Sequence, residues 1–575
     1  MADGSRGDGP HAGLDAGQFA RRVTNVADRV ARGVAGVWYA DVFRPNWRGM
    51  SIAVALNIGT YLTRFAEQVP ARLAVACGDY RATYAEEELR VNALALALKS
   101  LGTEKGDRVA ILQWNCPQFL ETMLACFKAG LCVVPINARL HPEEVRYHVQ
   151  DSEAAVVVYG HEFGADVAQI RETLTTTPKF ISLRAAAAWE LDFERLVQEH
   201  ATTVDQAVRV DADDLAWLFY TSGTTGHPKG AMLTHGNLDY AVTGYLADVL
   251  PIDCEDAALH AAPLSHGSGF QALANVARGA ANVILFPRQF EPPNVFETIA
   301  RYRITNLFLA PTMIKLLLNA PEIERYDLSS LRYVVYGGAP MYVDDLKAAV
   351  ARLGQVLVQI FGQGETPMTG TYLRRQEHVV HGSEQQEARL MSAGVPRTGI
   401  DVKIVNPVDH EVPRGQQGEL VVRGRTVMSG YWRQPEATAD VLRNGWLHTG
   451  DVGYMDTGGY VFILDRKKDM IISGGANIYS REIEEVIQQH PAVKEVAVVG
   501  VPDELWGESV KAIVALRDGY SATEHDIVNE CIAHLASYKK PKSVEFVPEL
   551  PKNAYGKILK RDLRERYWTR LDRGV

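Results

Sequence analysis

YTSGTTGHPKG, at residues 220–230, places hydroxyl residues, glycines and one lysine side by side. The apolar stretch before it, DLAWLFY, predicts a strand, and Thr234 after it can cap a helix, so we expect a strand-to-helix loop. Backbone N–H groups, an ammonium group and the hydroxyls of Thr221, Ser222, Thr224 and Thr225 can together face a polyphosphate. A solvated Ser/Thr/Gly linker is the alternative, which the density of hydroxyls beside a lysine disfavours.

The position of the lysine excludes one large class of phosphate loops. The Walker form GxxxxGK[ST] has its lysine directly after the second glycine, followed by a hydroxyl residue that reaches Mg²⁺. Here His227 and Pro228 come between Gly226 and the lysine. Gly230, which has no hydroxyl, then follows Lys229. The stretch therefore predicts a phosphate-binding loop of another kind.

Length and composition indicate a multidomain enzyme of the cytoplasm. With 575 residues the chain is too long for one core, and its net charge of -10 argues against nucleic-acid binding. The six cysteines are scattered without metal-ligand spacing, which is typical of buried thiols in a reducing compartment. We see no apolar run of transmembrane length and no signal-peptide core near residue 1.

The N-terminal extension, residues 1–50, contains one helical pattern. Its apolar residues recur at steps of three and four: Phe19, Val23, Val26, Val30, Val34 and Val37. Arginines lie off that stripe, so attachment to a membrane surface is one interpretation. Docking on the body of the protein or on a partner subunit is the favoured one, and a homodimer is compatible with it.

Short apolar runs alternate with helical patterns from about residue 55 to 430, which favours α/β layers with much parallel sheet. After Asp465 the sequence pattern changes: a charged run and two glycines are followed by the helical pattern SREIEEVIQQH and the strand pattern KEVAVVGV. We predict a large α/β domain of layered sheets over 51–467 and a small α+β domain over 468–575.

Further patches follow the phosphate loop in a fixed order. They are VVPINARLHPEE (133–144), APLSHGSGF (262–270), YGGAP (336–340), FGQGE (361–365), LHTGD (447–451), DRKKDMIISGGANIYSREIEE (465–485) and PKNAYGKILKRDL (551–563). Together with YTSGTTGHPKG they resemble the motifs of the acyl-adenylate-forming (ANL) superfamily, in its acyl-CoA synthetase branch. The match runs from about residue 55 to 565, and one patch alone would be weak evidence.

The resemblance implies a nucleotide site for ATP. Its residues would be Thr221, Ser222, Gly223, Thr224, Thr225, Gly226, Lys229, Gly338, Ala339, Pro340, Phe361, Gly362, Asp451 and Arg466. Phe361 would lie on the adenine, while Asp451 and Arg466 would contact the ribose. Glu365 and Thr225 would accompany Mg²⁺.

The resemblance also implies two successive reactions, adenylation and transfer to coenzyme A. Its catalytic residues would be Lys557, His266, Thr221 and Glu365, and its acyl pocket would include His266, Gly267, Gly337, Gly362 and Met368. Gly474 and Gly475 would approach the arm of coenzyme A. The small domain would rotate about a hinge at Lys468 between the two reactions.

One position departs from the family pattern, which commonly has Thr or Ser before the motif glutamate. This chain has Gly364, so a hydroxyl is missing. A subfamily variation with a roomier pocket is one interpretation. The sharper hypothesis is weakened adenylation, which would leave an enzyme that mainly forms thioesters from a supplied acyl-adenylate.

The substrate expected from these residues is a small-molecule carboxylic acid. APLSHGSGF contains no aspartate to hold an α-ammonium group, which argues against an amino acid. The small residues Gly267, Ser268, Gly269, Gly362 and Gly364 suggest room for a long, branched or polycyclic acid. Two alternatives stay open, namely a scaffold protein without turnover and transfer to a carrier protein at a basic patch of Lys539, Lys540 and Lys542. Free coenzyme A is favoured over the carrier.

Overall fold

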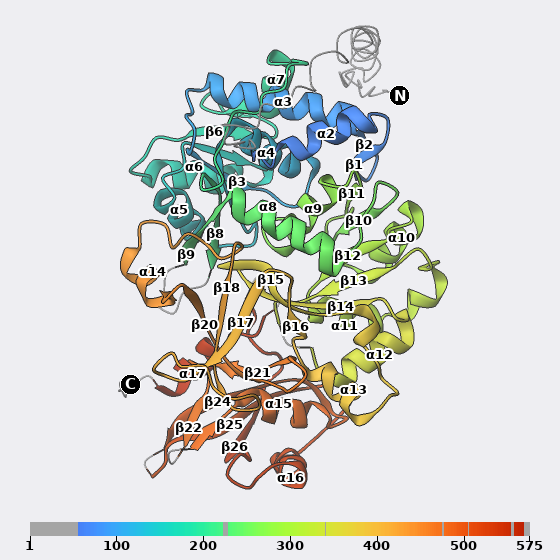
Figure 1. Ribbon diagram of the computed structural model, residues 1–575, viewed down its shortest axis with the longest axis vertical. Coiled ribbons are helices and arrows are strands. Elements are labelled where there is room, and N and C mark those ends of the chain that lie inside the picture. The colour runs from blue at the N-terminus through green and yellow to red at the C-terminus, as the bar shows by residue number, and fades with distance from the viewer. Residues whose placement is uncertain are drawn as a thin grey trace, which may run out of the picture. The chain divides into compact units, whose positions relative to one another are not determined.

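The computed structural model describes residues 56–221, 228–339, 341–473, 476–503, 505–553 and 557–568 (Figure 1). The expected helix at 19–37 lies outside these residues, as do 222–227, Pro340, Gly474 and Gly475. The side chain of Met368 is outside the description too. Within the described part of the chain, no helix is both long and apolar enough to cross a membrane.

The first sheet contains the strands that end at the phosphate loop. Its order is β7 (Leu191–Asp192), β6 (Lys179–Ser182), β5 (Val156–Tyr159), β3 (Arg108–Leu112), β4 (Cys132–Ile136), β8 (Leu215–Thr221) and β9 (Lys229–Thr234). All neighbours are parallel except β8 and β9. Helix α3 (Tyr84–Ser100) precedes these strands in the chain. Between them run α4 (Pro117–Ala129), α5 (Pro142–Asp151), α6 (Gly164–Thr173) and α7 (Phe193–Glu199), with a short η2 (His161–Phe163).

The second sheet begins and ends with antiparallel pairs around a parallel centre. Its order is β16 (Val395–Pro396), β15 (Thr366–Leu373), β14 (Leu357–Gln363), β13 (Tyr333–Tyr336), β12 (Asn306–Leu309), β10 (Ala257–His260), β11 (Ala281–Ile284), β1 (Leu73–Cys77) and β2 (Tyr80–Thr83).

Further helices lie on and around this second sheet. They are α2 (Thr60–Gln68), α8 (His235–Gly244) with the π-turn η3 (Tyr245–Val249), α9 (Gly267–Val276), α10 (Pro292–Tyr302), α11 (Pro311–Asn319), η4 (Pro321–Arg325), α12 (Val343–Leu353), η5 (Arg375–Glu377), α13 (Glu384–Ala388) and η6 (Arg389–Met391). One cluster of buried residues includes Val109 and Trp217 of the first sheet and Ile360 of the second. The two sheets and the helices between them therefore share a core.

A third, antiparallel sheet follows in the chain. It contains β17 (Ile400–Val405), β18 (Gly418–Gly424), β20 (Trp446–Met455) and β19 (Leu442–Arg443), with β21 (Val461–Arg466) paired to β20 and α14 (Pro435–Val441) before β19. β18 pairs antiparallel with β17 on one side and with β20 on the other.

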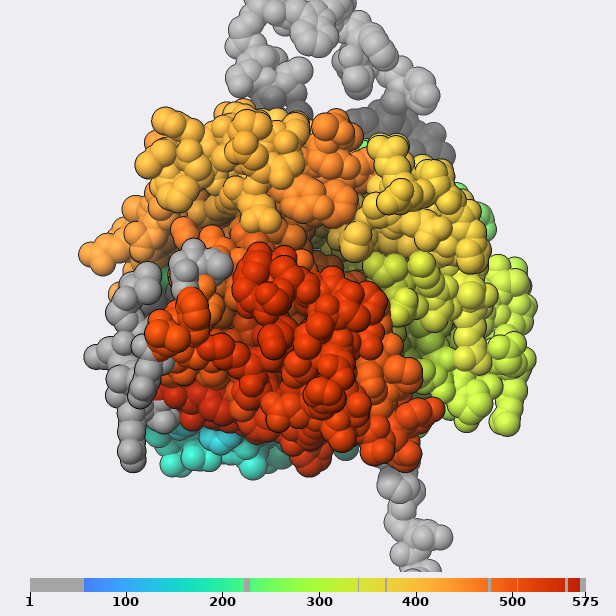
Figure 2. Space-filling view, turned by 90° about the horizontal axis from the view of Figure 1, so that it is seen from below, coloured from blue at the N-terminus to red at the C-terminus, as the bar shows by residue number. Residues whose placement is uncertain are grey.

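The C-terminal residues form a separate sheet with its own core, coloured orange to red in Figure 2. Its strands are β23 (Ala476–Ile478), β22 (Ile471–Ser473), β25 (Gly507–Leu516), β24 (Val493–Asp503) and β26 (Ser543–Phe546), and its helices are α15 (Ser480–Gln488), α16 (Glu524–His534) and α17 (Lys560–Trp568). Ile483, Val498 and Ile527 belong to one buried cluster there. This is the expected small α+β domain.

The phosphate stretch differs from the expected strand-to-helix loop. It connects β8 to a second strand, β9, and Thr221 pairs with Lys229 across the two ends. Helix α8 begins only after β9, where the Thr234 hydroxyl accepts from the backbone N–H of Asn237. The alternation in KGAMLT buries Ala231 and Leu233 completely, so these six residues extend the sheet before the cap appears.

Candidate active site

Glu365 lies in the turn between β14 and β15 and joins the second sheet to the first. Its Oε1 accepts hydrogen bonds from Thr221 Oγ1 at 3.0 Å and from the Tyr431 hydroxyl at 2.7 Å. The side chain is almost fully buried. Two of the sequence-predicted residues, Thr221 and Glu365, are thus brought together although 144 positions separate them.

Tyr431 is a site residue that the sequence analysis did not identify. Its ring lies under the Lys229 ammonium, 5.3 Å from Nζ to the ring centroid. Backbone bonds from Met232 N to Gly430 O (2.9 Å) and from Trp432 N to Gly230 O (2.8 Å) hold this segment beside β9. Burial, and then the neighbouring Glu365, raise the pKa of the Tyr431 hydroxyl. It therefore stays protonated and donates.

Asp451 and Arg466 face each other across the β20–β21 pair. Arg466 Nε lies 2.6 Å from Asp451 Oδ1, and Gln363 Nε2 donates to Asp451 Oδ2 at 2.7 Å. Burial raises the pKa of Asp451, while Arg466, Lys557 and Gln363 oppose that rise. Gln363 is the middle residue of FGQGE, and its role was not predicted.

Lys557 comes from the C-terminal domain and reaches the same group. Its charge acts on Asp451, and Arg466 and Asp451 in turn act on its own pKa. Loss of hydration first, and then repulsion by Arg466, lower the pKa of Lys557 to about 8. The residue as a whole is exposed. The backbone bonds Asn553 N to Lys557 O (2.8 Å) and Lys557 N to Asn553 Oδ1 (3.0 Å) close its loop.

Lys468 stands two positions after the end of β21. Its carbonyl accepts from Arg564 Nη1 at 2.8 Å, and burial lowers the pKa of its ammonium group. The segment is therefore tied to α17 in this arrangement. The hinge at Lys468, the domain boundary there, and coenzyme A contacts at Gly474 and Gly475 stay predictions.

His266 precedes α9 and faces an aromatic wall. Its ring centroid lies 4.9 Å from that of Phe219, which in turn stacks on Phe270 at 5.6 Å. Burial lowers the pKa of His266 to about 3. The imidazole is therefore neutral at physiological pH and can donate or accept a hydrogen bond but supplies no positive charge.

Three of the glycines expected to enlarge the acyl pocket, Gly267, Gly269 and Gly364, are closely packed instead. A β-carbon on Gly364 would lie 2.3 Å from Thr221 Cγ2, and one on Gly267 would lie 2.6 Å from Phe308 Cε1. A β-carbon on Gly269 would lie 2.2 Å from the Leu264 carbonyl oxygen. These three glycines permit close approach of neighbouring atoms, so their small size does not by itself create room in the pocket. The large acyl group stays a prediction.

An apolar recess lies beside the aromatic wall. It is lined by Leu238, Ala241, Val242, Tyr245, Phe270, Leu273 and Pro367. None of these was predicted, although Leu238, Ala241, Val242 and Tyr245 recur at the helical steps of three and four that reveal one face. Pro367 stands two positions after Glu365, and Phe270 is on the helix that His266 precedes, so the recess adjoins the carboxylate end of the site.

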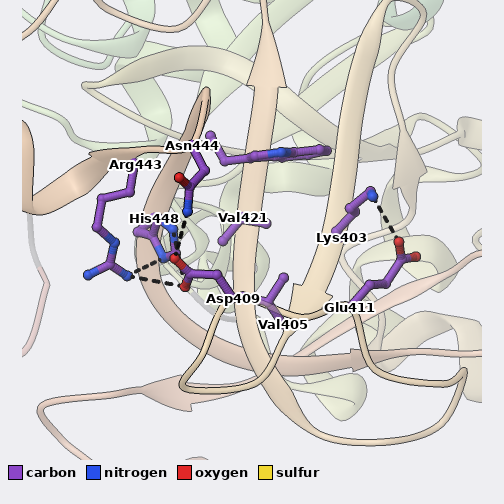
Figure 3. A pocket seen from close by; sticks show the side chains of 9 residues that line it. Lys403, Val405, Asp409, Glu411, Val421, Arg443, Asn444 and His448 are labelled. Carbon is purple, nitrogen blue, oxygen red and sulfur yellow. Dashed lines mark hydrogen bonds and ion pairs between the residues drawn. The ribbon is translucent and has the colours of Figure 1, made fainter.

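A second recess lies on the third sheet (Figure 3) and contains none of the predicted site residues. Its charged groups pair with one another: Lys403 Nζ lies 2.9 Å from Glu411 Oε2, and Arg443 Nη2 lies 3.5 Å from Asp409 Oδ1. Asn444 also donates to Asp409 at 3.2 Å. The recess consequently offers little unbalanced charge to a ligand.

The described residues contain no cluster of three or more His, Cys, Asp or Glu that would hold a metal ion by itself. Among the described residues, Thr221 and Tyr431 both donate to Oε1 of the Glu365 carboxylate. A single carboxylate fits Mg²⁺, which is commonly held by one or two carboxylates together with phosphate oxygens and water. Thr225, the other predicted metal contact, lies outside the described residues.

Comparison with known proteins gives the same assignment along nearly the whole chain. Residues 62–432 match the family model "AMP-binding enzyme", and residues 482–557 match "AMP-binding enzyme C-terminal domain". A feruloyl-CoA synthase of Amycolatopsis sp is 39% identical over 513 residues, which cover 89% of this chain and 99% of that protein. A long-chain-fatty-acid–CoA ligase of Mycobacterium tuberculosis is 36% identical, with 89% and 98% covered.

Solved structures agree with the fold. An amide bond synthetase from Marinactinospora thermotolerans has a TM-score of 0.80 at 32% identity, with 89% of this chain and 100% of that chain covered. The ATP-bound MatB from Rhodopseudomonas palustris has a TM-score of 0.80 at 30% identity, with 89% and 99% covered. The chain therefore belongs to the AMP-binding, adenylate-forming (ANL) enzyme superfamily, among its AMP-forming acyl-CoA ligases.

Proposed function

We propose that this chain is an ATP- and coenzyme A-dependent ligase for a carboxylic acid that is medium- to long-chain or bulky and is not an amino acid. The observation that carries the proposal is the electrostatic interaction of Lys557 with Asp451 and Arg466, because it links the C-terminal domain to the predicted nucleotide site. The ATP-bound relative supports ATP as the nucleotide.

In the first reaction an oxygen of the acid carboxylate attacks the α-phosphorus of ATP, and pyrophosphate leaves with the electrons of the broken P–O bond. Lys229, at the start of β9, neutralises the departing phosphates together with the preceding loop. Lys557 offers a second ammonium group to the carboxylate and the α-phosphate. Asp451 is oriented by Gln363 and Arg466 to accept from ribose hydroxyls. The chain provides positioning and charge, and no side chain needs to become a nucleophile.

Glu365 is the residue that would hold Mg²⁺. When bound, the ion would neutralise phosphate charge. Thr221 and Tyr431 orient the carboxylate by donating to one of its oxygens, and burial of the Tyr431 ring keeps that donor in place. The pair thus positions Glu365 before any nucleotide arrives.

In the second reaction the coenzyme A thiolate attacks the acyl carbonyl, and AMP leaves. We propose that the C-terminal domain rotates about Lys468 between the reactions, so that Lys557 withdraws and Gly474 and Gly475 approach the thiol arm. Lys557 stands in a loop closed by Asn553, which supports its movement together with the domain.

The substrate class rests on the apolar recess and on the relatives. Six of the seven residues that line the recess have no polar side-chain atom. The similar proteins include a feruloyl-CoA synthase, an indoleacetate–CoA ligase and long-chain-fatty-acid–CoA ligases. An apolar acyl group fits both observations.

Transfer to a carrier protein is the alternative, because a fatty acid–[acyl-carrier-protein] ligase of Streptomyces coeruleorubidus is 36% identical. The basic patch expected to attract an acidic carrier is largely neutralised, however. Lys539 Nζ lies 2.6 Å from Glu482 Oε1, and Lys542 Nζ lies 2.9 Å from Asp503 Oδ2. Coenzyme A is therefore favoured as the acceptor.

A panel of acids assayed separately for pyrophosphate release and for acyl-CoA tests the proposal. We expect both products from the same apolar acids, with Mg²⁺ required. Pyrophosphate without acyl-CoA, combined with acylation of a carrier protein, would favour the alternative. Acyl-CoA formed only from synthetic acyl-adenylate would favour the thioester-forming hypothesis, and no product from any acid would contradict a ligase.

A further inference from the structure

Tyr245 is the one residue lining the apolar recess that carries a polar side-chain atom. Its side chain is 4% exposed, and its hydroxyl has no hydrogen-bond partner among the residues that the structure describes. A buried hydroxyl without a partner costs free energy, and native proteins nearly always satisfy such groups. The orphaned hydroxyl therefore points to a ligand group.

The backbone places Tyr245 in an uncommon conformation. Helix α8 ends at Gly244, and the π-turn Tyr245–Val249 follows, with Leu250 N donating to Tyr245 O at 3.1 Å. π-turns inside or after α-helices occur frequently at functional sites. Here the turn sets Tyr245 on the same face as Leu238, Ala241 and Val242.

Tyr245 lies toward the part of the recess that is remote from Glu365. Its ring centroid is 6.0 Å from the Arg397 guanidinium, and Arg397 N donates to Gly370 O at 3.2 Å. Gly370 is on β15, and at the rise of an extended strand it stands about 16 Å beyond Glu365. Pro367, at the other part of the recess, is only two positions from Glu365. Tyr245 is thus linked through Arg397 to the part of β15 that lies farther from Glu365 than Pro367 does.

The charge beside Tyr245 favours a particular kind of hydrogen bond. Arg397 is 2% exposed, and its Nε lies 3.9 Å from Asp248 Oδ2, while Asp248 is held by Thr398 N at 2.8 Å. Burial lowers the pKa of Arg397 to about 10, so it stays charged at neutral pH. A cation near the ring makes the phenolic O–H a better donor, and the group it meets is then an acceptor.

We propose that the Tyr245 hydroxyl donates a hydrogen bond to an oxygen at the end of the acyl group remote from its carboxylate. The substrate class is an apolar acid with a distal hydroxyl, phenolic or carbonyl oxygen. This inference rests on the proposed function. An acid whose far end is purely hydrocarbon would bury the Tyr245 hydroxyl without a partner and would bind less well.

The test compares matched acids, with and without the distal oxygen, in wild type and in Tyr245→Phe. The pairs are para-hydroxycinnamate with cinnamate, and ω-hydroxyalkanoates with alkanoates of equal length. The wild type should favour the oxygenated member of at least one pair by about tenfold in kcat/KM for pyrophosphate release, the size expected for one buried hydrogen bond. Tyr245→Phe should abolish that preference by lowering only the rate of the oxygenated acid.

Tyr240→Phe is the matched control, since Tyr240 is also on α8 but does not line the recess. It should leave the preference unchanged. The thermal shift produced by each acid gives a second readout that is independent of turnover and also reports whether the variants fold.

A wild type that prefers no oxygenated acid in either assay would overturn the inference, and so would a preference that survives in Tyr245→Phe. Failure of the proposed function is distinguishable, because then no acid would release pyrophosphate. The thermal shifts of wild type and Tyr245→Phe with each acid would still show whether Tyr245 binds the distal oxygen.

Discussion

Gly364 and Phe219 occupy adjoining space that only a glycine permits: a β-carbon on Gly364 would lie 2.5 Å from Cδ1 of the Phe219 ring. The hydroxyl expected before Glu365 is therefore replaced by an aromatic ring from β8. Thr221, two positions after Phe219, supplies a hydroxyl to Glu365 at 3.0 Å. The departure at position 364 is thus a packing relationship between two strands, which weakens the case for defective adenylation.

Gly364→Ala should lower the rate of pyrophosphate release about tenfold or more, because the new methyl group displaces Phe219 or Thr221 from Glu365. Overpacking of this kind costs about 1–3 kcal/mol of stability. Adding Phe219→Ala should restore part of the loss, so the two changes are non-additive in a double-mutant cycle. Gly164→Ala is the control, since a β-carbon there meets nothing within 4 Å. Additive losses would show that Phe219 is not the obstacle.

Lys557→Ala should suppress adenylation by about 10²–10³ and leave thioester formation from synthetic acyl-adenylate largely intact. The physical reason is the position of Lys557 beside Asp451 and Arg466, which is needed only while the carboxylate and phosphate carry charge. Lys552→Ala is the matched control, because Lys552 pairs with Glu495. An equal fall in both half-reactions would refute the assigned role.

The pH dependence of adenylation should report the same lysine. Because its pKa is lowered to about 8, the charged fraction of Lys557 falls as pH rises through that value. In the wild type, kcat/KM for pyrophosphate release should decline on the alkaline side of about 8. In Lys557→Arg the guanidinium stays protonated, so the alkaline decline of kcat/KM should move to higher pH. If the decline occurs at the same pH in the arginine variant, the titrating group is not Lys557.

Tyr431→Phe should weaken pyrophosphate release only about three- to tenfold, the size of one neutral donor to a carboxylate. The ring under Lys229 is retained, so the cation–π contact persists. Glu365→Gln should cost about 10²–10³ and raise the Mg²⁺ concentration needed for half-maximal rate. The rate of pyrophosphate release, measured at increasing Mg²⁺ concentration, distinguishes the effect of Tyr431→Phe from that of Glu365→Gln. Equal losses in both variants would mean that Tyr431 does more than orient Glu365.

Glu87→Gln should stabilise the protein at neutral pH. Glu87 is fully buried, neither carboxyl oxygen has a partner in the described part of the chain, and burial raises its pKa well above the ordinary value. The folded state therefore holds a proton that the unfolded state loses above its pKa of about 4.3, so stability falls as pH rises from there. We expect a melting temperature roughly 2 °C higher at pH 7.

That gain should shrink toward pH 4, where both states are protonated. Glu88→Gln is the contrasting variant, because Glu88 pairs with the buried Lys128 ammonium; it should lower the melting temperature. A melting temperature of Glu87→Gln below that of wild type at neutral pH would contradict the assignment.

The sequence alone predicted the family, the α/β and α+β organisation and the alternation of short apolar runs with helical patterns that forms the parallel sheets, in which Cys132–Ile136 is one fully buried strand. Ordered motifs and local apolar runs carry that information, because strand and helix periodicity depends on neighbours in the chain. It also proposed Thr221, Lys229, Glu365, Asp451 and Arg466 as site residues, and in the fold they lie around Tyr431 and Gln363.

Only the tertiary structure revealed the pairing of β8 with β9 and the hydrogen bonds from Tyr431 to Glu365 and from Gln363 to Asp451. It also revealed the Phe219 ring beside Gly364 and the Tyr245 hydroxyl without a hydrogen-bond partner among the described residues. Each is a contact between segments distant in the chain; Tyr431 and Glu365, for example, are 66 positions apart. Such contacts depend on how separate sheets pack. A glycine or tyrosine in sequence does not show which side chain fills its space or whether its hydroxyl finds a partner.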